Sequence, residues 1–332
     1  MRICIYGAGA SGGHLAVRFA RAGHDVSVIA RGANLAAIRD RGLQLHIGDE
    51  TLTAAVAAFE VPADIGAQDL VIVATKATAL HAVAAQIAPL VGKDTRVVFP
   101  QNGMTWWYPL GLPASRLKPP SIPIFELAKP FLAAMRSNQV IGGISYTANV
   151  IEAPGVIRNN SPTHNRLELA AITDDGNAEL ADFRVMFEQA GLLSPDPGDI
   201  RAAVWGKLLT NVSGSVLGLA TMSQSDGARK DPALSEIYRR LAGEMMAIAA
   251  AHGYPLALDP EILIAKLLHH KASILQDYEQ HRPMEIEQIV LAPLAFARAA
   301  KIATPTFDTL AAIVTKLAKD RGLIAADAVV AL

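Results

Sequence analysis

The chain has 332 residues, of which 51% are hydrophobic and 18% are charged, and its 30 lysines and arginines nearly balance 31 aspartates and glutamates. This composition excludes a disordered chain, and the small net charge argues against a nucleic-acid-binding protein, which needs clustered basic residues. The length predicts about two domains. We find neither the roughly 20 uncharged apolar residues of a membrane helix nor a signal-peptide pattern, so we expect a cytoplasmic protein.

The first part of the chain alternates between short apolar strands and amphipathic helices. The run Asp69–Ala74 is apolar after its first residue, as in a parallel strand buried on both faces. Such alternation predicts a doubly wound parallel sheet, that is, a Rossmann-type α/β domain. The expected strands are 2–6, 25–30, 43–47, 51–57, 69–74 and 96–99, and the expected helices end at Gly23 or span 34–41 and 80–88.

The segment 104–137 differs in character, because it contains Trp106, Trp107 and six prolines. Loops of this length are often lids or partner surfaces. Strand-like segments return at 140–150, 156–157 and 167–172, and a helix is expected over 178–190.

From residue 199 onward the pattern is helical, with prolines near the expected helix starts. We therefore expect an α/β domain over 1–195 followed by an all-α domain over 196–332. The alanine-rich helices offer faces for a homodimer. The expected helices are 199–221, 233–252, 259–280, 285–301 and 306–319.

A glycine-rich loop directly follows the first strand and opens the first helix. In a G-x-G-x-x-G motif the first glycine permits a tight turn, the second lets the backbone approach a pyrophosphate, and the third lets helix and strand pack closely. The helix N-terminus adds the positive end of its dipole. A glycine-rich turn without a ligand is the alternative. The expected dinucleotide contacts are Gly7, Ala8, Gly9, Ala10, Ser11 and Gly12.

The residue after the second strand indicates which dinucleotide is bound. Sites that prefer NAD carry an acidic residue there, whereas this chain has Arg31. A guanidinium suits the 2′-phosphate of NADP(H), so we expect that cofactor. An ordinary exposed arginine is the alternative.

A polar stripe follows one face of the first C-terminal helix. Lys207, Asn211 and Ser215 are spaced i, i+4, i+8. A solvated face is the simpler interpretation, and a lysine general acid with substrate contacts beside it is the functional one.

Lys76 and Asn102 follow parallel strands, at whose carboxyl ends ligands bind. The histidines lack metal-ligand spacing, so no metal site is expected.

Together these motifs resemble the ketopantoate reductase family (2-dehydropantoate 2-reductases). The resemblance extends from the glycine loop and Arg31 through VATKA and QNG to IRAAVWGKLLTN, SILQD and Glu285. It implies an NADP-binding Rossmann domain over 1–195, a helical substrate domain over 196–332, and a substrate held in the cleft between them. It also implies reduction of a 2-oxo acid by NADPH to a 2-hydroxy acid, foremost ketopantoate to pantoate on the route to pantothenate.

The resemblance further implies individual roles. Lys207 would be the general acid that protonates the developing alkoxide, and Glu285 would orient Lys207 or contact the cofactor. The implied substrate contacts are Asn102, Lys207, Asn211, Ser215 and Ser273. Lys76, Asn102, Ala148 and Glu285 would join the glycine loop and Arg31 on the cofactor side.

Two departures keep other functions open. Ser215 and Ser225 stand where the family has asparagines, and serine offers fewer hydrogen-bonding groups. A reductase of a different 2-oxo acid is therefore one alternative. A non-catalytic NADP(H)-binding redox sensor is another, although such a sensor would need neither Lys207 nor Glu285.

Overall fold

The computed structural model describes residues 1–173 and 180–328, and the chain divides into two compact units. The sheet unit comprises Met1–Gln101 and Glu126–Ile200, and the helical unit comprises Asn102–Phe125 and Arg201–Leu332. The sequence predicted one boundary between residues 195 and 196. The chain instead enters the helical unit early, for residues 102–125, before it returns to the sheet unit.

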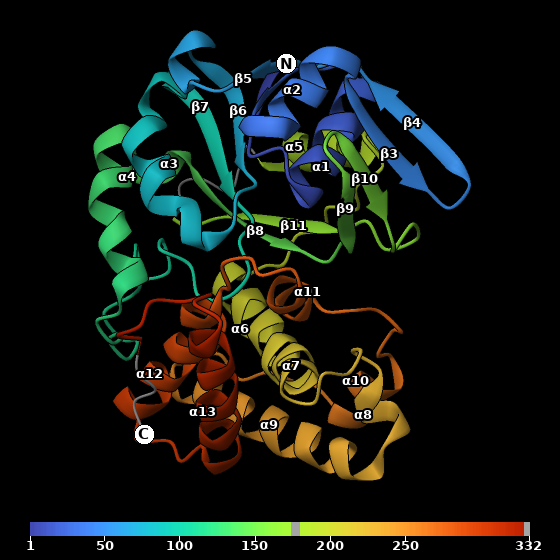
Figure 1. Cartoon of the computed structure of the whole chain (residues 1–332). Helices are drawn as coiled ribbons and strands as arrows, with labels where there is room; N and C mark the ends of the chain where they lie inside the picture. The colour runs from blue at the N-terminus through green and yellow to red at the C-terminus, as the bar shows by residue number, and fades with distance from the viewer. Residues whose placement is uncertain (174–179, 329–332) are drawn as a thin grey trace. The chain divides into compact units, whose positions relative to one another are not determined.

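The sheet unit is built on a seven-stranded sheet of order β11-β8-β7-β6-β1-β2-β5 (Figure 1). All neighbouring pairs are parallel except β11, which runs antiparallel to β8. The predicted doubly wound sheet is confirmed. Its strands are β1 (Arg2–Tyr6), β2 (Asp25–Ile29), β5 (Ala57–Phe59), β6 (Gln68–Val73), β7 (Val91–Phe99), β8 (Val140–Ser145) and β11 (Leu167–Ala171). Its α-helices are α1 (Ala10–Arg21), α2 (Gly32–Arg41), α3 (Leu80–Gln86), α4 (Ala128–Ala134) and α5 (Leu180–Gln189). Residues 178 and 179 of the predicted helix 178–190 lie outside the described residues.

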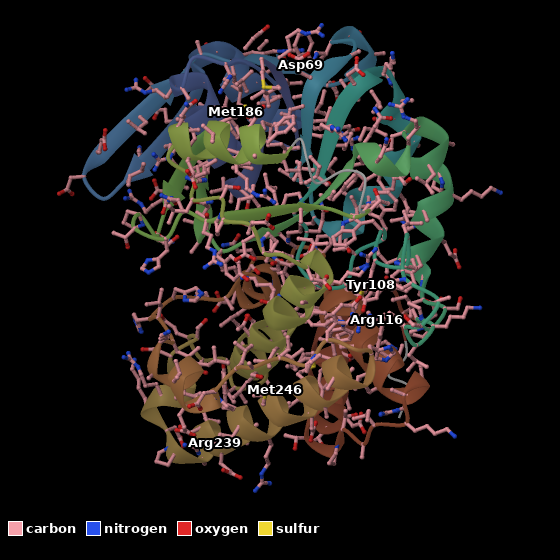
Figure 2. The ribbon with its side chains drawn as sticks, turned by 180° about the vertical axis from the view of Figure 1, so that it is seen from behind. Asp69, Tyr108, Arg116, Met186, Arg239 and Met246 are labelled. Carbon is pink, nitrogen blue, oxygen red and sulfur yellow. The ribbon has the colours of Figure 1, made fainter. Side chains whose placement is uncertain are left out.

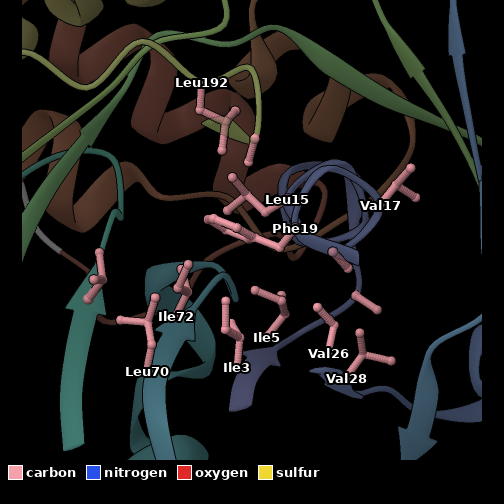
Figure 3. Close-up of a cluster of buried hydrophobic side chains, with 14 of the residues drawn as sticks. Ile3, Ile5, Leu15, Val17, Phe19, Val26, Val28, Leu70, Ile72 and Leu192 are labelled. Atoms are coloured by element: carbon pink, nitrogen blue, oxygen red, sulfur yellow. The ribbon is translucent and has the colours of Figure 1, made fainter. Parts of the chain in front are cut away.

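The core of this unit lies between the central strands and α1. Figure 3 shows Leu15 and Phe19 of α1 beside Ile3, Ile5 and Ile72 of β1 and β6. Burying each such side chain stabilises the fold by roughly 1.5 to 3 kcal/mol. Strands that are apolar on both faces can be covered on both sides, which is why the uninterrupted apolar runs form the centre of the sheet.

A second sheet, of order β4-β3-β10-β9, packs against α1. Its strands are β3 (Leu43–Ile47), β4 (Glu50–Ala54), β9 (Asn149–Ala153) and β10 (Val156–Asn159). Two predicted strands are wrong in extent, because each spans two real strands: 51–57 runs from β4 to β5, and 140–150 from β8 into β9. In both places the chain leaves one sheet and joins the other, and the pattern of apolar residues does not indicate which sheet a strand belongs to.

A buried polar cluster joins α1 to this second sheet. His14 is 1% exposed, and the Asn159 amide nitrogen lies 3.2 Å from its Nε2. Asn159 also donates to Asn165 Oδ1 at 2.5 Å and its oxygen accepts the Ser161 N–H at 2.7 Å. Burial, and secondarily the charge of Arg18, lowers the pKa of His14 to about 3.

We therefore expect acid to unfold the protein partly through His14. The unfolded chain protonates this histidine near pH 6.5 and the folded chain only near pH 3, so stability falls as the pH drops through that window. At pH 5 the loss attributable to His14 is about 2 kcal/mol relative to pH 7.5. Urea unfolding at both pH values should show a smaller pH dependence in His14→Gln than in the wild type. The same change at exposed His81 is the control, and an unaltered pH dependence in His14→Gln would contradict the assignment.

The helical unit confirms the predicted all-α character. Proline begins three of its helices, α9, α10 and α13, and Asp231 and Asp259 cap the first two through their carboxylates. The predicted helix 259–280 is wrong as a single element, because residues 266–272 separate α10 from α11. The elements are α6 (Ile200–Thr210), the π-helix η7 (Asn211–Val216), α7 (Leu217–Ala220), α8 (Gly227–Lys230), α9 (Pro232–Ala251), α10 (Pro260–Ala265), α11 (Ser273–Glu279), the π-helix η8 (Glu287–Leu291), α12 (Ala292–Ala299) and α13 (Pro305–Asp320). Within residues 1–173 and 180–328, no helix is long and apolar enough to cross a membrane.

The tryptophan-containing segment is part of the helical core. Trp106 and Trp107 are 0% exposed, so neither ring lies on an exposed surface. Tyr108 beside them accepts a hydrogen bond from Trp205 Nε1 at 2.9 Å, and its ring centroid lies 5.4 Å from that of Phe296. Figure 2 labels Tyr108 and Arg116 in this segment; the Arg116 guanidinium lies 4.6 Å from the centroid of the Tyr254 ring.

Candidate active site

The glycine loop between β1 and α1 has the geometry of a phosphate cradle. Gly7 has a φ of +105°, and a β-carbon on it would lie 2.7 Å from Thr75 Cγ2. A β-carbon on Gly12 would overlap the Gly7 carbonyl oxygen, so both positions require glycine. Around Gly9, by contrast, nothing lies within 4 Å of a built β-carbon. The second glycine thus leaves open space, as an approaching phosphate needs.

The backbone N–H groups of the loop fall into two sets: some donate to β2, and the others lie at the N-terminus of α1. The Gly7 and Ala8 N–H groups both donate to the Ile29 carbonyl, at 3.0 and 3.2 Å, which fixes the loop to β2. The first N–H groups of α1, from Ala10 to Gly12, have no acceptor within the helix. The first turn also holds no acidic side chain. This helix end therefore has the donors and the dipole that bind a pyrophosphate.

Arg31 and Asn34 lie at the start of α2. Arg31 occupies the N-cap position and is exposed, and its charge opposes the burial that raises the pKa of Tyr6 at the end of β1. The Asn34 amide donates to the Ala8 carbonyl at 2.7 Å and its oxygen accepts the Gly155 N–H at 2.8 Å. Asn34 thus holds the glycine loop in place. The sequence does not predict this role, because one asparagine early in a helix carries no distinctive signal.

Polar atoms also gather where β6 and β7 end. The Gln101 amide donates to the Val73 and Thr75 carbonyls, at 2.5 and 3.1 Å. Its own oxygen and the Thr75 hydroxyl are buried and make no hydrogen bond among the described residues. Lys76 follows Thr75 directly. β1 lies between β2 on one side and β6 on the other, so the direction in which successive strands are added reverses at β1. Open α/β sheets bind ligands beside such a point, at the carboxyl ends of the strands.

Ala148 lies beyond the carboxyl end of β8. Its N–H donates to Ser161 Oγ and its carbonyl accepts the Asn160 N–H, both at 2.8 Å. Only its methyl group is left for contact with a ligand. The residues predicted for the cofactor in the sheet unit all follow carboxyl ends of parallel strands: Gly7–Gly12, Arg31, Lys76 and Ala148. The open space beside Gly9 and the buried polar atoms of Thr75 and Gln101 fit a dinucleotide.

In the helical unit the predicted polar stripe crosses from α6 into η7. Asn211 is 9% exposed, and Lys207 and Ser215 are half-buried. The stripe is therefore not a solvated face. The side-chain nitrogen of Asn211 is buried and makes no hydrogen bond among the described residues, so it is available to a ligand. The wide turns of π-helices recur at functional sites, and this one begins at Asn211.

The other predicted residues of this unit lie on, or next to, elements that pack against η7. These are α11, which begins at Ser273, and η8, which follows Glu285. Asn102 is tied to η8 by its neighbours: the Met104 N–H donates to the Gln288 carbonyl at 2.9 Å, and a β-carbon on Gly103 would lie 2.6 Å from Gln288 Cβ. The structure thus brings the segments that contain Asn102, Asn211, Ser273 and Glu285 together within the helical unit.

Ser225 and His270 form a further pair in the helical unit. The Ser225 N–H donates to the His270 carbonyl at 2.9 Å, and Ser225 Oγ lies 3.5 Å from His270 Nε2. Burial lowers the pKa of His270, and the positive charge of Lys207 lowers it further. The sequence predicts no role for His270, because two adjacent histidines without metal-ligand spacing give no indication of their neighbours.

Comparison with known proteins agrees with this arrangement. Residues 3–110 match the family model of ketopantoate reductase PanE/ApbA, and residues 199–318 match its C-terminal model. The 2-dehydropantoate 2-reductase of Mesorhizobium japonicum is 37% identical over 97% of this chain and 99% of its own length. The enzyme of the same name from Pyrococcus horikoshii is 28% identical over 92% of this chain and 93% of its own length.

Solved structures show the same fold. A crystal structure from Ralstonia solanacearum assigned to the ketopantoate reductases superposes with a TM-score of 0.88 and 34% identity, over 97% of this chain and 99% of that one. D-mandelate dehydrogenase, solved with NADH and anilino(oxo)acetate, shares the fold at 20% identity, with a TM-score of 0.83 over 98% of this chain and all of that one. The resemblance inferred from the motifs is thereby confirmed, and the chain is a member of the ketopantoate reductase family.

Proposed function

We propose that this protein reduces 2-dehydropantoate to pantoate with NADPH. The observation that carries the proposal is the polar stripe of α6 and η7, where Lys207 lies one turn from Asn211, whose buried amide nitrogen makes no hydrogen bond among the described residues. Membership of the family and 37% identity to a 2-dehydropantoate 2-reductase over nearly the whole chain support the same substrate.

The sheet unit would hold the cofactor. The N–H groups at the start of α1 would bind the pyrophosphate, Arg31 the 2′-phosphate, and Lys76 and the Ala148 methyl group other parts of the molecule. Asn102 and Glu285 are the cofactor contacts proposed for the helical unit. When bound, NADPH supplies the hydride that the keto carbon gains.

The helical unit would hold the 2-oxo acid and provide the proton. Lys207 carries a proton on Nζ and gives it to the keto oxygen, which becomes the hydroxyl of the product. Its charge also stabilises the negative charge that develops on that oxygen. Asn211, Ser215 and Asn102 would bind the polar groups of the substrate, and Ser273 its carboxylate.

The test is NADPH oxidation followed at 340 nm with 2-dehydropantoate and a panel of other 2-oxo acids. Selective turnover of 2-dehydropantoate is the expected result. Preference for another acid would move the substrate assignment and would indicate Ser215 and Ser225 as its cause. Tight NADPH binding without turnover of any acid would contradict the proposal and favour a redox sensor.

Cofactor choice gives a separate expected outcome. Arg31→Ala should weaken NADPH binding by about 10- to 100-fold, the contribution of a hydrogen-bonded charge pair, and leave NADH binding nearly unchanged. Titration of both cofactors measures this. Arg21→Ala, at the far end of α1 and also exposed, is the matched control. Equal losses for NADPH and NADH would contradict the 2′-phosphate assignment.

A further inference from the structure

The residues that directly follow α13 contact the loop that contains Glu285. This loop, residues 280–285, links α11 to the helix that contains η8 and has no regular secondary structure. It turns at His281, which has a φ of +51°, a conformation that costs energy in a residue with a side chain. The loop therefore needs outside contacts to keep one conformation.

The helix α13 provides one of these contacts through its C-terminal cap. The Leu323 N–H donates to the Ala318 carbonyl at 2.9 Å and the Gly322 N–H to the Lys319 carbonyl at 2.8 Å. With Gly322 at a φ of +65°, this is a Schellman cap. The cap leaves the Leu323 carbonyl free to accept the Met284 N–H at 3.0 Å, directly before Glu285.

The same cap also contacts the last turn of α11, directly before the loop. The Arg321 guanidinium donates to the Tyr278 carbonyl at 3.0 Å and lies 3.9 Å from the centroid of the Tyr278 ring. A contact between the loop and α11 completes the arrangement, since Arg282 Nε lies 3.0 Å from Asp277 Oδ1 and the Arg282 N–H donates to the Asp277 carbonyl at 2.9 Å. Both ends of the loop are thus fixed, and Met284 and Glu285 are 2% and 6% exposed.

We infer that Arg321, Gly322 and Leu323, named here the α13 clamp, are positioning residues for Glu285. The inference rests on the proposed function, in which Glu285 orients Lys207 or contacts the cofactor. A buried carboxylate displaced by about 1 Å can lower turnover by up to 100-fold, so the clamp would act on the reaction without touching substrate or cofactor.

The test is a double-mutant cycle with Glu285→Gln in the full-length protein. Arg321→Ala and Gly322→Ala should each lower kcat/KM by about 10- to 100-fold when Glu285 is present and by less than twofold in the Glu285→Gln background. Arg321→Lys, which keeps the charge beside Tyr278, should restore most of the activity. Lys319→Ala, which removes a charge from the last turn of the same helix, is the matched control and should change little. Equal losses in both backgrounds would overturn the inference.

Amide hydrogen exchange gives a readout that needs no substrate. Peptides that cover residues 280–290 should exchange faster in Arg321→Ala and Gly322→Ala than in the wild type, and unchanged exchange would overturn the clamp. If the wild type reduces no 2-oxo acid, the proposed function fails while this measurement still decides whether the clamp holds the loop. Wild-type kinetics in Glu285→Gln would overturn the functional half of the inference.

Discussion

Replacing Lys207 with alanine is expected to lower kcat by about 1,000-fold, within the range that general acids contribute. The loss arises because alanine can neither protonate the keto oxygen nor stabilise the charge on it. NADPH affinity should change little, because Lys207 of α6 is not among the proposed cofactor contacts, most of which belong to the sheet unit. Steady-state kinetics at saturating substrate, with a fluorescence titration of NADPH, measure both quantities.

Two features make this variant informative. Alanine is a strong helix former, so α6 should persist and the folded protein can be compared directly with the wild type. Lys266→Ala removes an exposed lysine from the same unit and should retain full activity. Turnover within tenfold of the wild type in Lys207→Ala would show that another group delivers the proton.

Replacing Gly12 with alanine is expected to weaken NADPH binding by about 100-fold and to destabilise the protein by about 1 to 3 kcal/mol. The added methyl group would overlap the Gly7 carbonyl oxygen and lie 3.0 Å from Ala74 Cβ, so α1 must move away from β1. That shift displaces the helix end that would bind the pyrophosphate. NADPH titration and thermal unfolding measure the two effects.

Two further glycines separate binding from folding. Gly9→Ala meets nothing within 4 Å, so it should leave stability unchanged and weaken NADPH binding alone, because its methyl group fills the phosphate cradle. Gly243→Ala, inside α9 and also without a neighbour within 4 Å, should leave NADPH binding unchanged and stabilise the protein by about 0.5 to 1 kcal/mol. Wild-type NADPH affinity in Gly9→Ala would place the pyrophosphate elsewhere.

The sheet and the glycine loop could be predicted because their signals are local. An apolar run such as Asp69–Ala74 indicates a central strand, and the spacing of Gly7, Gly9 and Gly12 reflects steric requirements that lie within a few residues of one another. The predicted stripe of Lys207, Asn211 and Ser215 is similar, because helical spacing alone puts these residues near one face.

The remaining features depend on partners that are distant in the sequence. The second sheet pairs β3 with β10, more than 100 residues apart, and neither strand pattern specifies the other. Asn34, His270 and the α13 clamp matter through single contacts to backbone or side chains far along the chain. The break between α10 and α11 at residues 266–272 likewise depends on tertiary contacts, because the sequence there continues a helical pattern.

The early passage of residues 102–125 into the helical unit has a consequence for synthesis of the protein on the ribosome. Trp106, Trp107 and Tyr108 emerge long before Trp205 and Phe296, against which Tyr108 packs. At ordinary translation rates the Tyr108 ring stays without Phe296 for about 10 to 40 seconds. The nascent chain thus presents Tyr108 without these partners after the strands of the sheet have been made, and a fragment that stops near residue 195 would lack them altogether.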